Sequence, residues 1–280
     1  MKTKDIITKI LIGLMFLLCL SAIAFIFGYV VIKGIGEISI EFITGVPEGI
    51  PQGTEGGIFP AIAGSLLAMI IAMAISSALA VSTAVFNVFF NRWKRLKDFI
   101  VFVNRILAGL PSIIFALFGY GVFIVMFGIN RSLITASMTL AVMIYPFIEI
   151  NTEKILCDID SQFIQDSRGL GVSDGYMVMR MILPEAARSI GSTVILGGSY
   201  AVGATAPVIL TGAVLFAKVP KSLTDPVMML PFHLHMLLSQ GISVEKAYGT
   251  AFVLIILLII INSAAFLMSR DWRKKNAENK

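Results

Sequence analysis

Charge is scarce in this chain. Asp, Glu, Lys and Arg together make up 14% of its 280 residues, whereas apolar types reach 57%. A soluble domain usually carries about 25% charged residues, because it has a polar surface to cover. The composition therefore argues against an ordinary soluble domain and favours a protein that is largely surrounded by lipid.

Cysteine is equally scarce, with two residues in the whole chain. Cys19 lies inside an apolar run and Cys157 in a predicted loop, so they cannot pair and indicate no disulfide framework. The apolar run around Cys19 is longer than the usual signal-peptide core of roughly 7–15 residues. We expect it to be retained as a membrane span.

Catalytic patterns are missing as well. The sequence has no Ser-His-Asp or Cys-His arrangement and no paired carboxylates in a plausible pocket, so an enzyme is not expected. It has no Gly-x-x-x-x-Gly-Lys-Ser/Thr loop, so it should not hydrolyse ATP itself. His233 and His235 alone do not make a metal site, and we expect neither a metal nor a cofactor.

Long uncharged runs dominate what remains. A helix needs roughly 20 apolar residues to cross a hydrocarbon core of ~30 Å. Six stretches meet or approach that length, and they predict an all-α polytopic membrane protein with six transmembrane helices. The predicted spans are residues 10–32, 60–88, 106–128, 132–149, 190–215 and 247–269. We divide the chain into residues 1–57, the first helix and an outer loop, and a core domain over 58–280.

The distribution of basic residues predicts the orientation. With six spans, 17 of the 22 Lys and Arg residues fall on the side that holds both termini. The positive-inside rule places that side, and both termini, in the cytoplasm of a bacterial or archaeal cell. The clusters at residues 92–97 and 270–275 are expected to meet anionic lipid. The net charge of +5 thus has a topological cause and implies no nucleic-acid partner.

Small residues form a ridge along the second predicted span. They recur every four residues, and close backbone approach at such positions drives helix packing in lipid. The ridge packs either within the chain, which we favour, or on another subunit. Its members are Gly64, Ala68, Ala72, Ser76, Ala80 and Ala84. In the fifth predicted span, Pro207 is expected to introduce a kink.

The cytoplasmic loop over residues 150–188 predicts a helical elbow. Residues 161–168 and 173–182 are typical of two short amphipathic helices, with Gly169 and Gly171 between them. Glycine permits the positive φ that a sharp corner needs, and Ser173 is a suitable N-cap for the second helix. Such an elbow can transmit a movement on the cytoplasmic side to the membrane-spanning helices.

At this elbow the sequence resembles the permease subunit of a bacterial ABC importer. The family's loop reads Glu-Ala-Ala, three residues, Gly, nine residues, Ile, one residue, Leu-Pro. Here Gly171, Leu183 and Pro184 match at the correct separations. The remaining positions depart from the pattern, and they hold Gln165, Asp166, Ser167 and Met181.

Further segments resemble the phosphate-type (PstA) permease in family order. They are residues 56–62, 107–114, 205–207, 225–226, 230–231 and 247–251. The resemblance implies the type I importer permease fold and a PstC-like sister permease. It also implies two PstB-like ATPase subunits on the elbows and an extracytoplasmic solute-binding protein.

The resemblance leaves the solute open between phosphate and a different or less charged compound. Where phosphate permeases usually carry charge, this chain has Ile150, Tyr200 and Ala204. Arg105 is the remaining candidate cation, although a charge near a helix end more often snorkels to the interface. The candidate path residues are Arg105, Tyr200, Ala204, Thr205 and Pro207.

Two alternatives of other classes also stay open. One is a self-sufficient carrier or channel, although such proteins usually place ionisable groups at mid-membrane. The other is a structural scaffold. Glu149, after the fourth predicted span, could pair with Arg105, but a solvated helix end is the favoured prediction.

Overall fold

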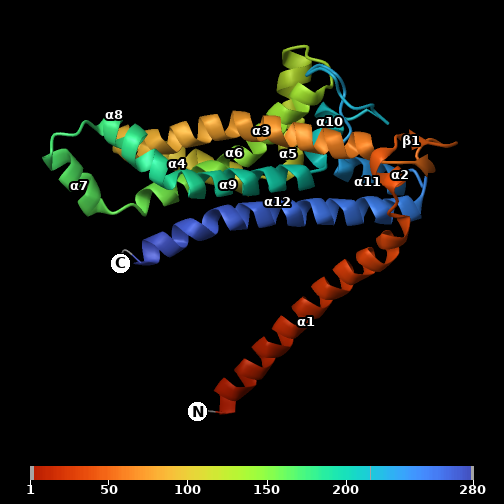
Figure 1. Ribbon diagram of the computed structural model, residues 1–280, viewed down its shortest axis with the longest axis horizontal. Helices are drawn as coiled ribbons and strands as arrows, with labels where there is room; N and C mark the ends of the chain where they lie inside the picture. The colour runs from red at the N-terminus through yellow and green to blue at the C-terminus, as the bar shows by residue number, and fades with distance from the viewer. Residues whose placement is uncertain (1–2, 215, 279–280) are drawn as a thin grey trace.

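The computed structural model describes residues 3–214 and 216–278, and helices dominate them (Figure 1). The α-helices are α1 (Thr3–Gly34), α2 (Ile40–Thr44), α3 (Phe59–Val85), α4 (Lys94–Gly109), α5 (Ser112–Gly119), α6 (Leu133–Cys157), α7 (Ser161–Gly169), α8 (Asp174–Met177), α9 (Leu183–Gly203), α10 (Ala206–Thr211), α11 (Leu230–Ser239) and α12 (Val244–Glu278). The shorter elements are the 3₁₀ turn η1 (Ile35–Glu37), the π-helical turns η2 (Phe86–Phe90), η3 (Tyr120–Met126) and η4 (Val178–Ile182), and an antiparallel pair of strands, β1 (Pro47–Glu48) and β2 (Glu55–Gly56). The prediction of an all-α membrane protein is confirmed.

Within the described residues, four helical stretches are long and apolar enough to cross a membrane. They are Thr8–Glu37, Phe59–Phe90, Leu133–Cys157 and Val244–Ser269. They correspond to the first, second, fourth and sixth predicted spans. Length and composition thus identify four of the six spans directly.

The third predicted span is bent. Lys94–Gly109 and Ser112–Met126 meet the span criteria only together, and they meet at an angle of 104°. The bend falls at Leu110 and Pro111, which lie between the two helices. Proline has no backbone N–H to continue the α4 hydrogen-bond ladder, so the chain turns there. Counting the bent pair as one span raises the total to five.

The fifth predicted span is also interrupted, so the count of six is not confirmed. Helix α9 starts at Leu183, before the start of the expected span, and ends at Gly203. Ala204 and Thr205 separate it from the short helix α10, in whose first turn Pro207 lies. Pro207 therefore begins a helix, where its missing N–H is harmless, and the predicted kink within a continuous span is wrong.

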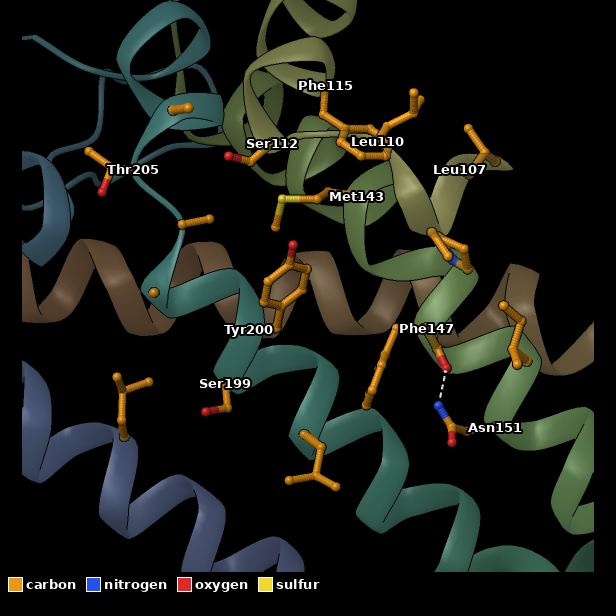
Figure 2. A pocket seen from close by; sticks show the side chains of 18 residues that line it. Leu107, Leu110, Ser112, Phe115, Met143, Phe147, Asn151, Ser199, Tyr200 and Thr205 are labelled. Carbon is orange, nitrogen blue, oxygen red and sulfur yellow. Dashed lines mark hydrogen bonds between the residues drawn. The ribbon is translucent and has the colours of Figure 1, made fainter. Parts of the chain in front are cut away.

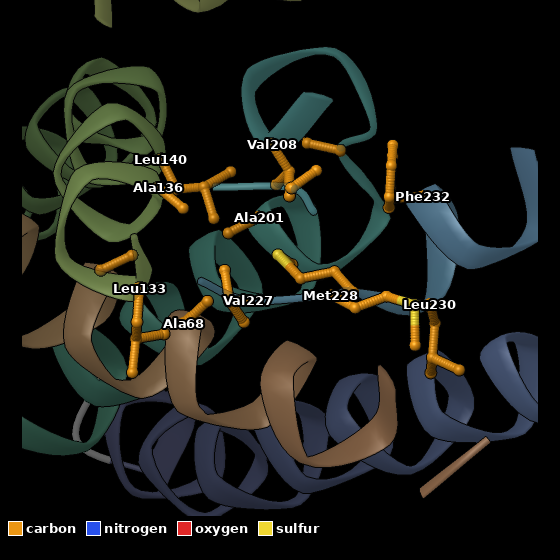
Figure 3. Packing of buried hydrophobic residues seen from close by; sticks show 14 of the residues in the cluster. Ala68, Leu133, Ala136, Leu140, Ala201, Val208, Val227, Met228, Leu230 and Phe232 are labelled. Carbon is orange, nitrogen blue, oxygen red and sulfur yellow. The ribbon is translucent and has the colours of Figure 1, made fainter. Parts of the chain in front are cut away.

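Helices α3, α6 and α9 lie side by side and form the centre of the bundle, with α12 along one flank (Figure 1). The ridge of small residues is buried: Ala68, Ala72, Ser76 and Ala80 are each 0% exposed within this chain. Figure 3 shows Ala68 packed among side chains of the main cluster, including Leu133 and Val227. The favoured prediction of packing within the chain is confirmed.

Helix α1 diverges from this bundle (Figure 1). None of the apolar window of its span is buried by the rest of the chain. It touches α12 near its C-terminal end, where the rings of Tyr29 and Tyr248 meet edge to face at 5.7 Å. Beyond it, the segment between α1 and α3 folds onto α12: Phe42 is buried, and Lys246 Nζ donates to the Gly56 carbonyl at 2.7 Å.

Candidate translocation path and coupling elbow

A partly open cavity of about 1020 Å³ lies within the helix bundle (Figure 2). Its wall comes from α4, α5, α6, α9, the 203–206 segment and α12. The lining residues are Leu107, Ala108, Leu110, Ser112, Phe115, Met143, Pro146, Phe147, Ile150, Asn151, Leu196, Ser199, Tyr200, Gly203, Ala204, Thr205, Ala206 and Leu258. Both helix breaks, at residues 110–111 and 204–205, contribute to this wall.

The polar groups of the wall are all neutral. Five side chains supply them: Ser112, Asn151, Ser199, Tyr200 and Thr205. The Asn151 Nδ2 donates to the Phe147 carbonyl at 2.7 Å, as the dashed line in Figure 2 marks. The other side of the amide, its oxygen, remains an acceptor. Among the described residues that line the cavity, none is Lys, Arg, His, Asp or Glu.

The cavity gathers some of the candidate path residues. Tyr200, Ala204 and Thr205 line it, and so does Ile150. Ile150, Tyr200 and Ala204 stand where phosphate permeases usually carry charge, and all three line this cavity. Positions 150 and 204 are 54 residues apart in the chain.

Arg105 and Pro207 lie apart from the cavity lining. The Arg105 side chain is exposed on α4, and Pro207 is buried in α10. Sequence reasoning missed Met143, Phe147 and Asn151, which line the cavity from α6. They recur every four residues and thus share one helix face, a signal that periodicity could have supplied.

A separate polar cluster lies where η2, which follows α3, meets α6. Glu149 is 1% exposed, and Asn87 Nδ2 donates to its Oε1 at 3.5 Å. The predicted solvated helix end is therefore wrong, because α6 continues past Glu149 to Cys157 and the Glu149 side chain is buried. Nearby, Lys97 Nζ lies 3.6 Å from Glu153 Oε1.

The elbow has the predicted glycine corner. Gly171 has a φ of +79°, and its N–H donates to the Arg168 carbonyl at 3.0 Å. The Ser173 hydroxyl accepts from the Tyr176 N–H at 3.4 Å, so it caps α8 as predicted. The Arg168 guanidinium Nε lies 2.9 Å from Asp174 Oδ1 and ties the two arms together. Gly169 is instead the last residue of α7.

One face of the elbow is anchored and the other is open. Met177, Val178 and Ile182 are buried in a cluster with Leu156 of α6. Large apolar side chains remain exposed on the other face, namely Leu170 at 85%, Tyr176 at 60% and Met179 at 66%.

The loop positions compared with the family motif are spread over both faces of the elbow. Gln165, Asp166 and Pro184 are exposed, Met181 and Leu183 are half-buried, and Ser167 is buried. The Ser167 hydroxyl donates to the Phe163 carbonyl at 2.8 Å, within α7. The elbow thus offers a surface to a partner while it rests on the bundle.

The comparison with known families agrees with this architecture. The family described as "Binding-protein-dependent transport system inner membrane component" matches residues 78–274. The match spans well over half of the chain and includes the cavity wall and the elbow. The chain belongs to this family of importer permeases.

Individual relatives narrow the comparison to the PstA type. A probable phosphate transport system permease protein PstA of Methanocaldococcus jannaschii is 26% identical over 56% of this chain and 56% of that protein. A PstA 2 protein of Mycobacterium bovis is 27% identical over 56% of this chain and 53% of its own length. The matched region is thus about half the length of these relatives. The probable ABC transporter permease protein YqgI of Bacillus subtilis is 28% identical over 99% of both chains.

Solved structures show the same fold. An inward-facing structure of the MetNI methionine ABC transporter superposes with a TM-score of 0.59 at 20% identity, over 77% of this chain and 94% of that one. A second crystal form of that transporter gives a TM-score of 0.56 at 18% identity, over 78% and 96% of the two chains. This likeness concerns the fold and says nothing of the solute.

Proposed function

We propose that this chain is the membrane-spanning permease subunit of an ATP-driven importer. One observation carries the proposal: a glycine-cornered elbow continues directly into a helix that lines the cavity. The elbow ends at η4, α9 begins at Leu183, and Tyr200 on the same helix faces the cavity (Figure 2).

Helix α9 supplies a mechanical link. From Leu183 to Tyr200 it spans about 26 Å at ~1.5 Å per residue. Its backbone hydrogen bonds make it a stiff rod, so a displacement of the elbow moves the cavity wall. Gly197 and Gly198 keep it slim where it meets α6 and α3, since their Cα atoms face Ile148 and Met73. Small residues of this kind let helix backbones approach one another closely, so α9 is packed tightly against both helices.

The partners follow from this role. Two cytoplasmic ATPase subunits of PstB type would bind the exposed face of the elbow. A PstC-like sister permease would close the open side of the cavity, and an extracytoplasmic solute-binding protein would deliver the solute. Both termini and the elbow would then lie in the cytoplasm, with residues 1–57 beside a core domain of 58–280. ATP hydrolysis belongs to the partners, and the chain itself is non-catalytic.

The solute has two candidates. Phosphate is supported by the names of the PstA relatives. A less charged solute is supported by the neutral lining of the cavity. Measuring which solute stimulates ATP hydrolysis by the purified complex separates the two.

The substitution Gly171→Leu tests the coupling role. A non-glycine residue at positive φ costs roughly 1–2 kcal/mol, so the corner should rearrange while the spans stay intact. We expect normal insertion and assembly, continued ATP hydrolysis, and a loss of solute moved per ATP.

Gly128→Leu is the matched control. Gly128 also has a positive φ (+67°) and open space around it, but it lies after η3, far along the chain from the elbow. Its substitution should leave coupling unchanged. Full coupled uptake by Gly171→Leu, or equal losses in both variants, would count against the proposal.

A further inference from the structure

We infer that the cavity accepts an uncharged, amphipathic small solute rather than a multiply charged anion. The inference rests on the proposed function and names the class of solute for the same site. It follows from the chemistry of the wall, which combines broad apolar surface with a few neutral hydrogen-bonding groups.

The apolar part of the wall is large. Leu107, Phe115, Met143, Phe147 and Leu196 reach the cavity from α4, α5, α6 and α9. In Figure 2, Phe147 extends from α6 toward α9, and a Cβ at Gly197 would lie 3.6 Å from its ring. Such a surface stabilises a solute that carries an apolar portion, because contact removes both from water.

The polar part of the wall can bind hydroxyl, amide or carbonyl groups. The hydroxyls of Ser112, Tyr200 and Thr205 form no hydrogen bond with the other described residues. Each can therefore donate to, or accept from, a solute. Asn151 adds its amide oxygen as an acceptor. Small-molecule sites are typically built in this way, with an apolar wall and a few placed polar groups.

A dianion would find no charged partner on this wall. None of the described lining residues is basic, and the exposed Arg105 lies outside the lining. Burying a charge without an opposite charge or several donors is strongly unfavourable in a low-dielectric site. The wall also lacks an acidic residue, so it offers no opposite charge to a cation either.

The charge preference can be measured with thiol reagents. Gly203→Cys and Ala108→Cys place a thiol on two different helices of the wall, and a Cβ at Gly203 meets nothing within 4 Å. Both are made in a Cys19→Ser, Cys157→Ser background, in the assembled complex. Gly36→Cys is the matched control, because Gly36 is exposed, has nothing within 4 Å of its added Cβ and lies away from the elbow. Each is reacted with neutral methyl methanethiosulfonate and with anionic 2-sulfonatoethyl methanethiosulfonate.

The measured quantity is the ratio of anionic to neutral reaction rate, which cancels the intrinsic reactivity of each thiol. We expect this ratio to be about tenfold or more lower at the cavity cysteines than at the Gly36→Cys control. Inorganic phosphate should leave the rate of neutral modification unchanged. A ratio equal to or above that of the control overturns the inference, including the case in which a sister subunit supplies cations. Protection by phosphate also overturns it.

This result is independent of coupling. If the proposed function is wrong, Gly171→Leu should show normal coupling, or the elbow should have no ATPase partner. Neither outcome alters the charge preference at residue 203. The two failures are therefore distinguishable.

Discussion

Gly64→Ala adds one methyl group at a close contact of the α3 ridge. The new Cβ would contact the Met228 carbonyl oxygen and lie 2.8 Å from Val227 Cγ2. Neither neighbour can shift into open space, because Val227 and Met228 are 0% and 1% exposed and belong to the main hydrophobic cluster (Figure 3). Overpacking of this kind costs roughly 1–3 kcal/mol. Alanine favours a helix over glycine by up to ~1 kcal/mol, so the net loss should be up to about 2 kcal/mol, whereas the propensity gain alone would stabilise the protein.

The assay is unfolding of the purified chain in detergent, by heat or by denaturant. Gly121→Ala is the control, because the same methyl group there meets nothing within 4 Å. Its stability should be unchanged or slightly raised. Equal stability of the two variants would refute the claim that α3 packs tightly against the 227–228 segment in this chain.

Two further changes test single contacts. The Ser65 hydroxyl accepts from the Leu230 N–H at 2.9 Å in a fully buried position, so Ser65→Ala should cost ~1–3 kcal/mol of stability. Ser77→Ala is the control, because the Ser77 hydroxyl bonds only within its own exposed helix face. It should be near neutral in the same unfolding assay. His233 lies on α11, outside the membrane-spanning helices, and burial lowers its pKa from 6.5 to about 4. Because the pKa is depressed, the stability contributed by neutral His233 is fully present above pH 6.5 and falls as the pH drops toward 4, by ~3 kcal/mol at most. Unfolding midpoints at pH 7 and pH 5 measure this loss. A His233→Gln variant with the same pH dependence would contradict it.

Local signals in the sequence predicted the elbow well. Gly171 adopts positive φ and Ser173 caps α8, because both effects depend on residues within one or two turns. Four spans were equally accessible, since an uncharged run of sufficient length needs no tertiary information. These parts of the fold follow from chain-local chemistry.

The helix breaks were not accessible in the same way. A count of uncharged residues over 106–128 and 190–215 measures composition, whereas the bends at residues 110–111 and 204–205 depend on how proline-containing segments pack. Composition alone also placed Pro207 inside a continuous helix rather than at the start of α10. Both breaks contribute to the cavity wall, so the structure departs from prediction where the site is built.

The candidate path residues lie partly in the cavity. Tyr200, Ala204 and Thr205 line the cavity, whereas Arg105 lies outside its lining. Glu149 shows why sequence could not decide such cases: its partner Asn87 lies 62 residues earlier in the chain. Whether a charged group is solvated or covered depends on that distant partner, and no local pattern records it.

Photo-crosslinking from the elbow tests the central claim most directly. A photoreactive residue at position 176, where Tyr176 is 60% exposed, is introduced in native membranes, with position 223 in the loop before α11 as the control (Leu223 is 52% exposed). The account predicts that position 176 crosslinks to a nucleotide-hydrolysing subunit in the cytoplasm and that position 223 does not. Labelling of position 176 from outside the cell, or its failure to capture any such subunit, would contradict the account.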